Sequence, residues 1–150
     1  KDQVIRSESF SQAYLNSSVD EWATRVRIID NNKGYITLKS SLTGLINYEF
    51  EYSIPRKDAI ELIQLSKYKI TKIRYQLKIN KKNWVVDVFE ESNSCLKIAE
   101  IELNSESEEI QVPSWCGKEI TGIKSLSNAS LAKAPISELS VKDRIKIKSF

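Results

Sequence analysis

The chain has 150 residues, of which 41% are hydrophobic, and its 23 basic and 20 acidic residues give a net charge of +3. This length suits one domain with a hydrophobic core. Because the numbers of basic and acidic residues are nearly equal, the net charge gives no support for a nucleic-acid or membrane partner. The absence of histidine excludes Ser-His and Cys-His nucleophile systems. Cys95 and Cys116 lack a metal-binding spacing and predict reduced thiols in a cytoplasmic protein.

Most of the chain alternates apolar and polar residues with a period of two, which is typical of β-strands. Two segments rich in turn-forming residues, 31–34 and 80–83, predict hairpin connections between strands. The strands expected from this pattern cover residues 8–15, 23–30, 35–40, 47–54, 69–79, 84–89 and 97–103.

Two segments predict helices. Pro55 is followed by a polar turn and an apolar stripe over residues 59–65, and a second helix is expected to start at Ser127 or Asn128. Many strands and few helices indicate an α+β domain with an antiparallel sheet, plausibly closed into a barrel. We expect this domain to cover residues 1–135 and a tail to cover residues 136–150, where the alternation in 144–148 fits either an edge strand or an unstructured end.

Pairs of like charges stand two residues apart on four of the expected strands, so that both members of each pair share a face. These pairs are Arg25 and Arg27, Glu49 and Glu51, Lys72 and Arg74, and Glu100 and Glu102. Thr37 and Lys39 share a face in the same way, and Asp87 stands alone among apolar residues.

Periodicity alone leaves two interpretations of these charged faces open. An antiparallel sheet commonly has one face in water, which would account for them without a function. Like charges two residues apart repel each other, however, and a solvated face usually mixes signs. Cationic pairs suit phosphate oxygens, and carboxylate pairs suit a hard cation such as Mg²⁺ or Mn²⁺. The pairing therefore favours a metal-polyphosphate site on a face turned inward.

Ten short segments give the chain a resemblance to the CYTH, or triphosphate tunnel metalloenzyme, superfamily, over roughly residues 12–135. The segments, in chain order, are 12–15 (QAYL), 25–27 (RVR), 36–39 (ITLK), 48–55 (YEFEYSIP), 72–75 (KIRY), 84–89 (WVVDVF), 99–103 (AEIEL), 113–115 (PSW), 118–121 (KEIT) and 128–131 (NASL). The bacterial branch with this pattern is similar to inorganic triphosphatases.

The resemblance implies an eight-stranded antiparallel barrel whose charged tunnel binds a triphosphate and Mg²⁺ or Mn²⁺, with metal-assisted hydrolysis by water. It implies phosphate ligands at Arg25, Arg27, Lys39, Lys72 and Arg74. It implies metal ligands at Glu100, Glu102 and Asp87. It implies catalytic roles for Lys39, Lys72, Glu49 and Glu51, the acids binding metal or orienting water and the basic residues. Homodimerisation is left open.

The chain departs from the family pattern at several positions. The first strand of the family carries Glu-x-Glu-x-Lys, and no such motif precedes Gln12; because the chain has no methionine and begins with Lys1, we expect that strand to lie upstream. Asn47 and Ser125 stand where arginine is usual, and Cys95 where glycine is usual. These departures leave open a weakly catalytic module that binds polyphosphate or nucleotide. Thiamine triphosphatase and adenylyl cyclase activities remain less favoured alternatives.

Overall fold

The structure is a computed structural model of the chain; it describes residues 3–16, 22–42, 46–103, 105 and 108–140, with the backbone alone at 3, 41–42 and 46–47. Its strands are β1 (Gln3–Asn16), β2 (Ala23–Ile29), β3 (Lys33–Leu42), β4 (Ile46–Ile54), β5 (Tyr68–Ile79), β6 (Lys82–Phe89) and β7 (Lys97–Ile101). Its helices are α1 (Arg56–Leu65), α2 (Asn128–Lys133) and the one-turn 3₁₀ helices η1 (Glu91–Asn93), η2 (Lys124–Leu126) and η3 (Ile136–Glu138).

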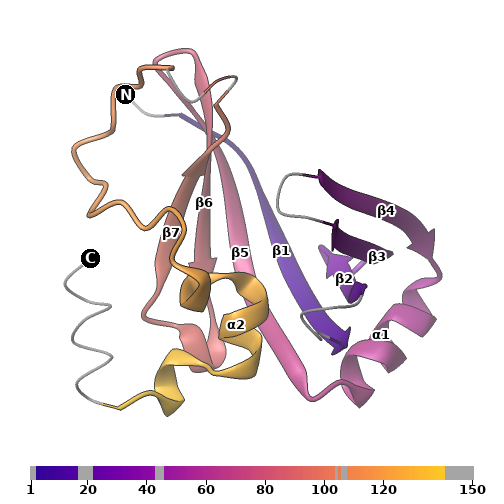
Figure 1. Cartoon of the computed structure of the whole chain (residues 1–150). Coiled ribbons are helices and arrows are strands. Elements are labelled where there is room, and N and C mark those ends of the chain that lie inside the picture. The colour runs from indigo at the N-terminus through magenta and orange to yellow at the C-terminus, as the bar shows by residue number, and fades with distance from the viewer. Residues whose placement is uncertain (1–2, 17–21, 43–45, 104, 106–107, 141–150) are drawn as a thin grey trace.

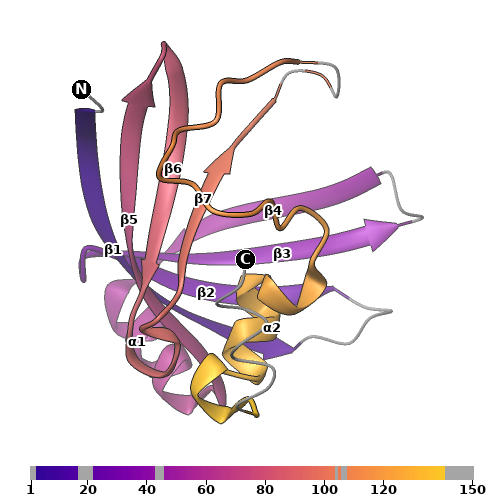
Figure 2. The same cartoon turned by 90° about the vertical axis from the view of Figure 1, so that its left-hand side faces the viewer.

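The seven strands form one antiparallel sheet in the order β4-β3-β2-β1-β5-β6-β7, so that β1 is the central strand (Figure 1). Successive strands are neighbours in the sheet, except that β4 is followed by β5, which pairs with β1 instead. The sheet is strongly coiled, and β2, β3 and β4 run across the direction of β5, β6 and β7 (Figure 2). The sheet therefore has an inner, concave face and an outer, convex face.

The hairpin turns are tight and use left-handed backbone conformations. Asp30 and Asn31 both have φ of 50°, and Asn80 and Lys81 have φ of 49° and 66°. Asn and Asp tolerate this region better than other non-glycine residues. The Asp30 side chain also accepts a 2.8 Å hydrogen bond from the backbone N–H of Ser9, which joins the β2–β3 turn to β1.

One apolar core lies on the outer face beneath α1. Ala59 and Ile63 of this helix pack on Ala13 and Val26, which point outward from β1 and β2. Gly34 allows the helix to come this close, because a Cβ atom at this position would lie 2.8 Å from the Cβ of Ala59. The helix therefore fixes the relative placement of β1, β2 and β3 from outside the concave face.

A second apolar core fills one end of the inner face. Tyr14, Ile70 and Phe89 from the sheet contact Leu131 of α2 in a buried cluster. Asn93, only 3% exposed, donates to the carbonyl of Leu131 at 3.3 Å and accepts from the N–H of Ile136 at 2.9 Å. The C-terminal helices are thus fastened over this end of the sheet, and the charged side chains occupy the remainder of the inner face.

The sequence predicted the antiparallel α+β fold, the hairpins and both helices, and these predictions are confirmed. The described residues form seven strands of an open sheet rather than the eight of a closed barrel, since β4 and β7 are its two edges. The outer face is only partly covered, because Tyr48, Phe50 and Tyr52 of β4 are 44–56% exposed. The basic alternation at 144–148 lies outside the described residues. No helix in the described part of the chain is long and apolar enough to cross a membrane.

Candidate functional site

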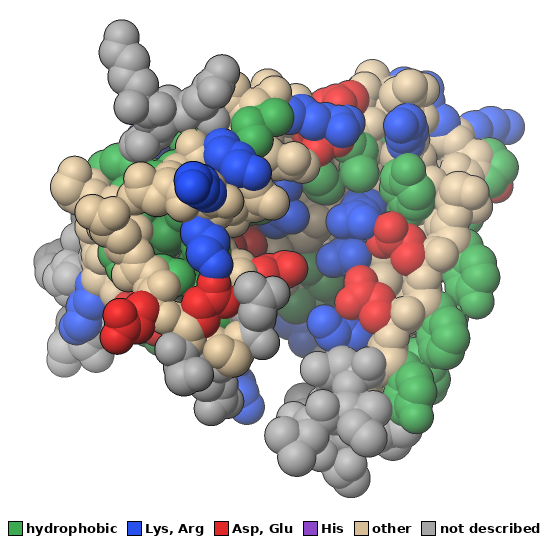
Figure 3. All heavy atoms as spheres, turned by 90° about the horizontal axis from the view of Figure 1, so that it is seen from above, with side chains coloured by type: hydrophobic (Ala, Val, Ile, Leu, Met, Phe, Trp, Pro, Cys, Tyr) green, Lys and Arg blue, Asp and Glu red, His purple; other side chains and the backbone are tan. Residues whose placement is uncertain are grey.

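Alternate residues of the strands from β2 to β7 bring the predicted charges onto the inner face. Arg25 is paired with Thr37, and Thr37 with Glu51, while Arg74 is paired with Asp87 across β5 and β6. Seen from above, basic and acidic side chains alternate around a hollow between the two halves of the sheet (Figure 3). The structure therefore resolves the ambiguity that periodicity left: these charges face one another across a concave surface rather than lying on separate solvated faces.

The residues of β2, β3 and β4 form one half of the site, which we call the β2–β4 cluster: Arg25, Arg27, Thr37, Lys39, Glu49 and Glu51. Arg27 donates from Nη2 to both carboxylate oxygens of Glu51, at 2.9 and 2.8 Å. The Thr37 hydroxyl, 2% exposed as a residue, accepts from Arg25 at 3.1 Å and donates to Glu51 at 2.8 Å. Glu51 is therefore the hub of this cluster.

Glu49 is held more loosely than Glu51. Its carboxylate lies 3.6 Å from Arg25 Nη2 and 3.5 Å from Lys39 Nζ, and 46% of its side chain is exposed. Burial tends to raise the pKa of the Glu51 carboxyl, but hydrogen bonds from Thr37 and Arg27 outweigh it and lower this pKa. Glu51 is thus a poor proton acceptor, and Glu49 is the more exposed carboxylate of this cluster, with only longer ion-pair contacts at its two oxygens.

Two guanidinium groups of this cluster carry unused donors. The Nε atoms of Arg25 and Arg27 are buried, and no hydrogen-bond partner for either is found among the described residues. A buried donor without a partner costs on the order of 1–3 kcal/mol, more for a charged group. Such a cost is offset when an anion accepts these hydrogen bonds, and phosphate oxygens suit the flat fork of arginine.

The residues of β5, β6 and β7 form the second half, which we call the β5–β7 cluster: Lys72, Arg74, Asp87 and Glu100. Lys72 Nζ lies 2.5 Å from Asp87 Oδ2, with 1% and 2% of the two side chains exposed. Arg74 donates to both oxygens of Asp87 at 2.7 Å. One buried carboxylate therefore holds two cations side by side.

Burial and charge act on these groups in opposite directions. Burial lowers the pKa of the Lys72 ammonium, although Asp87 partly counters this. Burial tends to raise the pKa of the Asp87 carboxyl, but the hydrogen bond from Arg74 and the charge of Lys72 prevail, and this pKa is lowered. The hydrogen bond to Asp87 raises the pKa of Arg74. Asp87 is thus held ionised between its two partners.

Several inner-face residues were not predicted as site residues. Glu8, 8% exposed, faces Arg74 from β1 and lies 2.5 Å from Arg6. Asn128, at the start of α2, accepts a 3.1 Å hydrogen bond from Lys72. Phe10 lies on β1 between the two clusters. Period-two alternation along β1 could have placed Glu8 on the same face as Phe10. The contact between Lys72 and Asn128, in contrast, depends on how α2 packs.

Two exposed carboxylates at the end of β7, Glu100 and Glu102, are the candidates for binding a metal ion. Within the described ranges, no group of three or more Asp, Glu or Cys is placed to hold a metal ion. Glu100 is 56% exposed as a side chain and contacts Arg74 only at 3.7 Å, and Glu102 is exposed just beyond β7. Mg²⁺ is usually held by one or two carboxylates together with substrate phosphates and water. The residues therefore fit a cation shared with a phosphate ligand.

The family model described as "CYTH domain" matches residues 1–134. The chain belongs to this family. An inorganic triphosphatase of Acetivibrio thermocellus is 38% identical over 128 residues, which cover 84% of this chain and 81% of that protein. CYTH membership accounts for the order of the ten segments along the sequence and for the coiled antiparallel sheet.

Solved structures agree with the CYTH assignment. The crystal structure of the inorganic triphosphatase NE1496 has a TM-score of 0.69 and 27% identity, and covers 85% of this chain and 86% of its own. A conserved hypothetical protein from Pyrococcus furiosus, 24% identical with a TM-score of 0.51 over 71% of this chain and 68% of its own, shares the fold. The open sheet described here is therefore the CYTH tunnel fold.

Proposed function

We propose that this chain hydrolyses inorganic triphosphate in the hollow between the β2–β4 and β5–β7 clusters. The observation that carries the proposal is the pair of buried, unpartnered Nε donors of Arg25 and Arg27 beside carboxylates. The similarity to an inorganic triphosphatase over most of both chains supports the same substrate. Nucleoside or organic triphosphates are the alternative substrates, because the described site shows no feature that selects for a base or a thiamine ring.

In this proposal, the basic side chains of both clusters bind the phosphates. Arg25 and Arg27 would grip one part of the chain of phosphates through their free Nε donors, with Lys39 beside them. Lys72 and Arg74 would bind another part while Asp87 keeps both in place. Fixed cations stabilise the charge of a transferring phosphoryl group because they need no reorganisation as the reaction proceeds.

The two glutamates of β4 take different roles in this proposal. Glu51 has both oxygens engaged by Arg27 and Thr37, so it orients those side chains. Glu49 is more exposed and would orient the attacking water and accept its proton. The water oxygen bonds to a terminal phosphorus, the P–O bond to the neighbouring phosphate breaks, and orthophosphate and pyrophosphate leave.

Glu100 and Glu102 would hold the divalent cation together with phosphate oxygens, and Mg²⁺ or Mn²⁺ bound there would neutralise part of the phosphate charge. Asp87 stays a prediction as a third ligand, since its oxygens already accept from Lys72 and Arg74. Four further points also stay predictions: the identity of the metal as Mg²⁺ or Mn²⁺, the cytoplasmic location, a homodimer, and the domain boundary at residue 135.

Phosphate release from tripolyphosphate with Mg²⁺ or Mn²⁺ tests the proposal. We expect Arg27→Gln to lower kcat/KM by at least about tenfold, since a charge-assisted hydrogen bond is lost. The matched control is Lys57→Gln on α1, whose side chain is 84% exposed. No release above background by the unaltered protein, at every metal tried, would exclude hydrolysis.

The second candidate, a module that binds polyphosphate without turnover, rests on Asn47 and Ser125. Ser125 is exposed in η2, and the side chain of Asn47 lies outside the described part of the chain. Titration calorimetry with tripolyphosphate separates the two functions. Binding without phosphate release supports the module, and turnover excludes it.

A further inference from the structure

Phe10 is a buried aromatic side chain in the middle of a charged surface. It lies on β1, the central strand, points to the inner face, and is paired with Ile29 on β2 and Lys72 on β5. Only 6% of it is exposed, yet it belongs to neither of the two apolar cores. Neither core therefore accounts for its burial, and two guanidinium groups lie over its ring.

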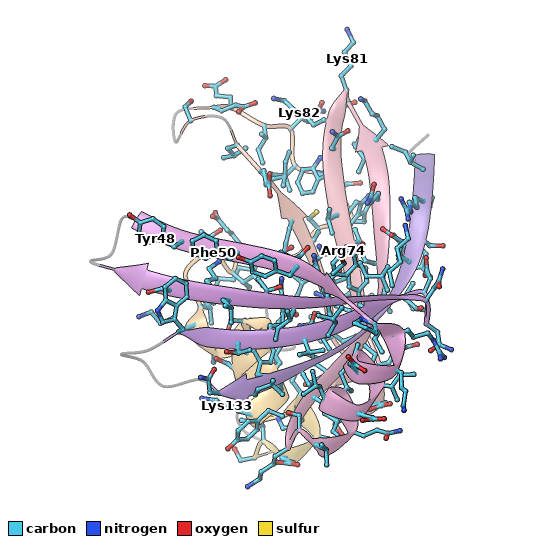
Figure 4. The ribbon with its side chains drawn as sticks, turned by 90° about the vertical axis from the view of Figure 1, so that its right-hand side faces the viewer. Tyr48, Phe50, Arg74, Lys81, Lys82 and Lys133 are labelled. Atoms are coloured by element: carbon cyan, nitrogen blue, oxygen red, sulfur yellow. The ribbon has the colours of Figure 1, made fainter. Side chains whose placement is uncertain are left out.

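The ring of Phe10 contacts one arginine from each half of the site. The guanidinium carbon of Arg27 lies 5.8 Å from the ring centroid, and that of Arg74 lies 5.4 Å from it. The two guanidinium carbons are therefore no more than about 11 Å apart, the sum of these distances. Arg74 lies between the two halves of the sheet, whereas Tyr48 and Phe50 lie along β4 (Figure 4).

An aromatic face attracts a guanidinium through its quadrupole, and this attraction strengthens where water is excluded. The ring engages the faces of both guanidinium groups, so their edges still donate to Asp87 and Glu51, and on Arg27 the buried Nε has no partner among the described residues. Leucine would fill a similar volume without attracting either cation. Phe10 thus restrains two like charges through their faces, while Glu51 and Asp87 pair with them at their edges.

We propose that Phe10 is a positioning residue that holds Arg27 and Arg74 at a separation suited to a chain of phosphates. This inference rests on the proposed phosphate site and adds a reason for its selectivity. A linear triphosphate can contact both arginines at once, whereas a single orthophosphate gains from only one. Phe10 therefore favours tripolyphosphate over orthophosphate, and its removal lowers that preference.

The test compares Phe10→Leu and Phe10→Tyr in the full chain, with Phe50→Leu as the matched control. Phe50 is 44% exposed and contacts the ring of Trp22 on the outer side of β4. Calorimetry gives Kd for tripolyphosphate and for orthophosphate, steady-state kinetics gives KM and kcat, and thermal melting reports folding.

For Phe10→Leu we expect Kd and KM for tripolyphosphate to rise about tenfold, with Kd for orthophosphate changed by less than about twofold. Phe10→Tyr keeps the aromatic ring and should retain the preference for tripolyphosphate over orthophosphate. Phe50→Leu should leave this preference unchanged. Equal weakening of both anions, or no change in either, overturns the inference. If the unaltered protein binds tripolyphosphate without hydrolysing it, the proposed hydrolysis fails and the ratio of Kd values still decides the role of Phe10.

Discussion

Lys72 and Asp87 form an ion pair between neighbouring strands that is 2.5 Å long and almost completely buried. Replacing Asp87 by Asn would leave a buried ammonium without its counter-charge. Removing one partner of such a pair typically costs about 3–5 kcal/mol. We expect Asp87→Asn to lose this much free energy of unfolding in urea at pH 7. A double variant, Lys72→Met with Asp87→Leu, should recover part of the loss, and a loss below about 1 kcal/mol in the single variant would contradict the burial seen here.

Acid should destabilise the fold through Asp87 and Glu51, whose pKa values are both lowered from ordinary values of 3.8 and 4.5. A carboxyl with a lower pKa in the folded state binds protons more readily when unfolded. Its stabilisation is complete above the ordinary pKa and is lost as the pH falls through the folded value. We expect the free energy of unfolding to decline below about pH 4.5. Denaturant titrations from pH 7 to pH 3 measure this decline, which should be shallower in Glu51→Gln.

Thr37→Val tests the hydroxyl that links Arg25 to Glu51. Valine has nearly the same shape, so the change removes the two hydrogen bonds and leaves a buried side chain in place. We expect KM for tripolyphosphate to rise about three- to tenfold, because Arg25 loses its orientation. Thr24→Val on β2 is the control, since Thr24 alternates with Arg25 and lies opposite Leu38 on the outer face. An unchanged KM would show that Thr37 serves packing alone.

Gly34→Ala tests how closely α1 approaches the sheet. The added Cβ would lie 2.8 Å from the Cβ of Ala59 and 2.9 Å from the carbonyl oxygen of Ile54. Overpacking of this kind costs about 1–3 kcal/mol, because backbone must shift to admit the methyl group. We expect a corresponding fall in unfolding free energy, measured in urea. Lys33→Ala, at an exposed neighbouring position, should have little effect, and a neutral Gly34→Ala would show that α1 can move.

The charge pairs were predictable because a strand keeps residues i and i+2 on one face whatever surrounds it. Arg25 and Arg27, and Lys72 and Arg74, share the inner face for this reason. The start of β1 was not predictable: the expected strand began at residue 8, and the observed one begins at Gln3. Val4 and Ile5 are both exposed, and the register with β5 shifts between Val4 and Arg6, so alternation is lost there.

Contacts between distant elements were beyond the sequence pattern. Alternation places Phe10 on a face but does not reveal that Arg27 and Arg74 both reach its ring, since that requires the register of β1 against β5. The hydrogen bond from Lys72 to Asn128 depends on the second apolar core, which fastens α2 across one end of the sheet. Local period and long-range packing thus determine different parts of the site.

The position of β1 at the centre of the sheet has a consequence for folding. β1 to β4 and β5 to β7 are two meanders of sequential hairpins, and among the described strands only the β1–β5 ladder joins them. Closing that ladder brings Phe10 opposite Lys72 across the intervening strands and α1. Such a non-local pairing requires the entropy of a long loop to be lost before its contacts form, and it slows folding. We therefore expect the two charged clusters to form within separate hairpin units and to meet only in the last step, so that anion binding reports completion of the fold.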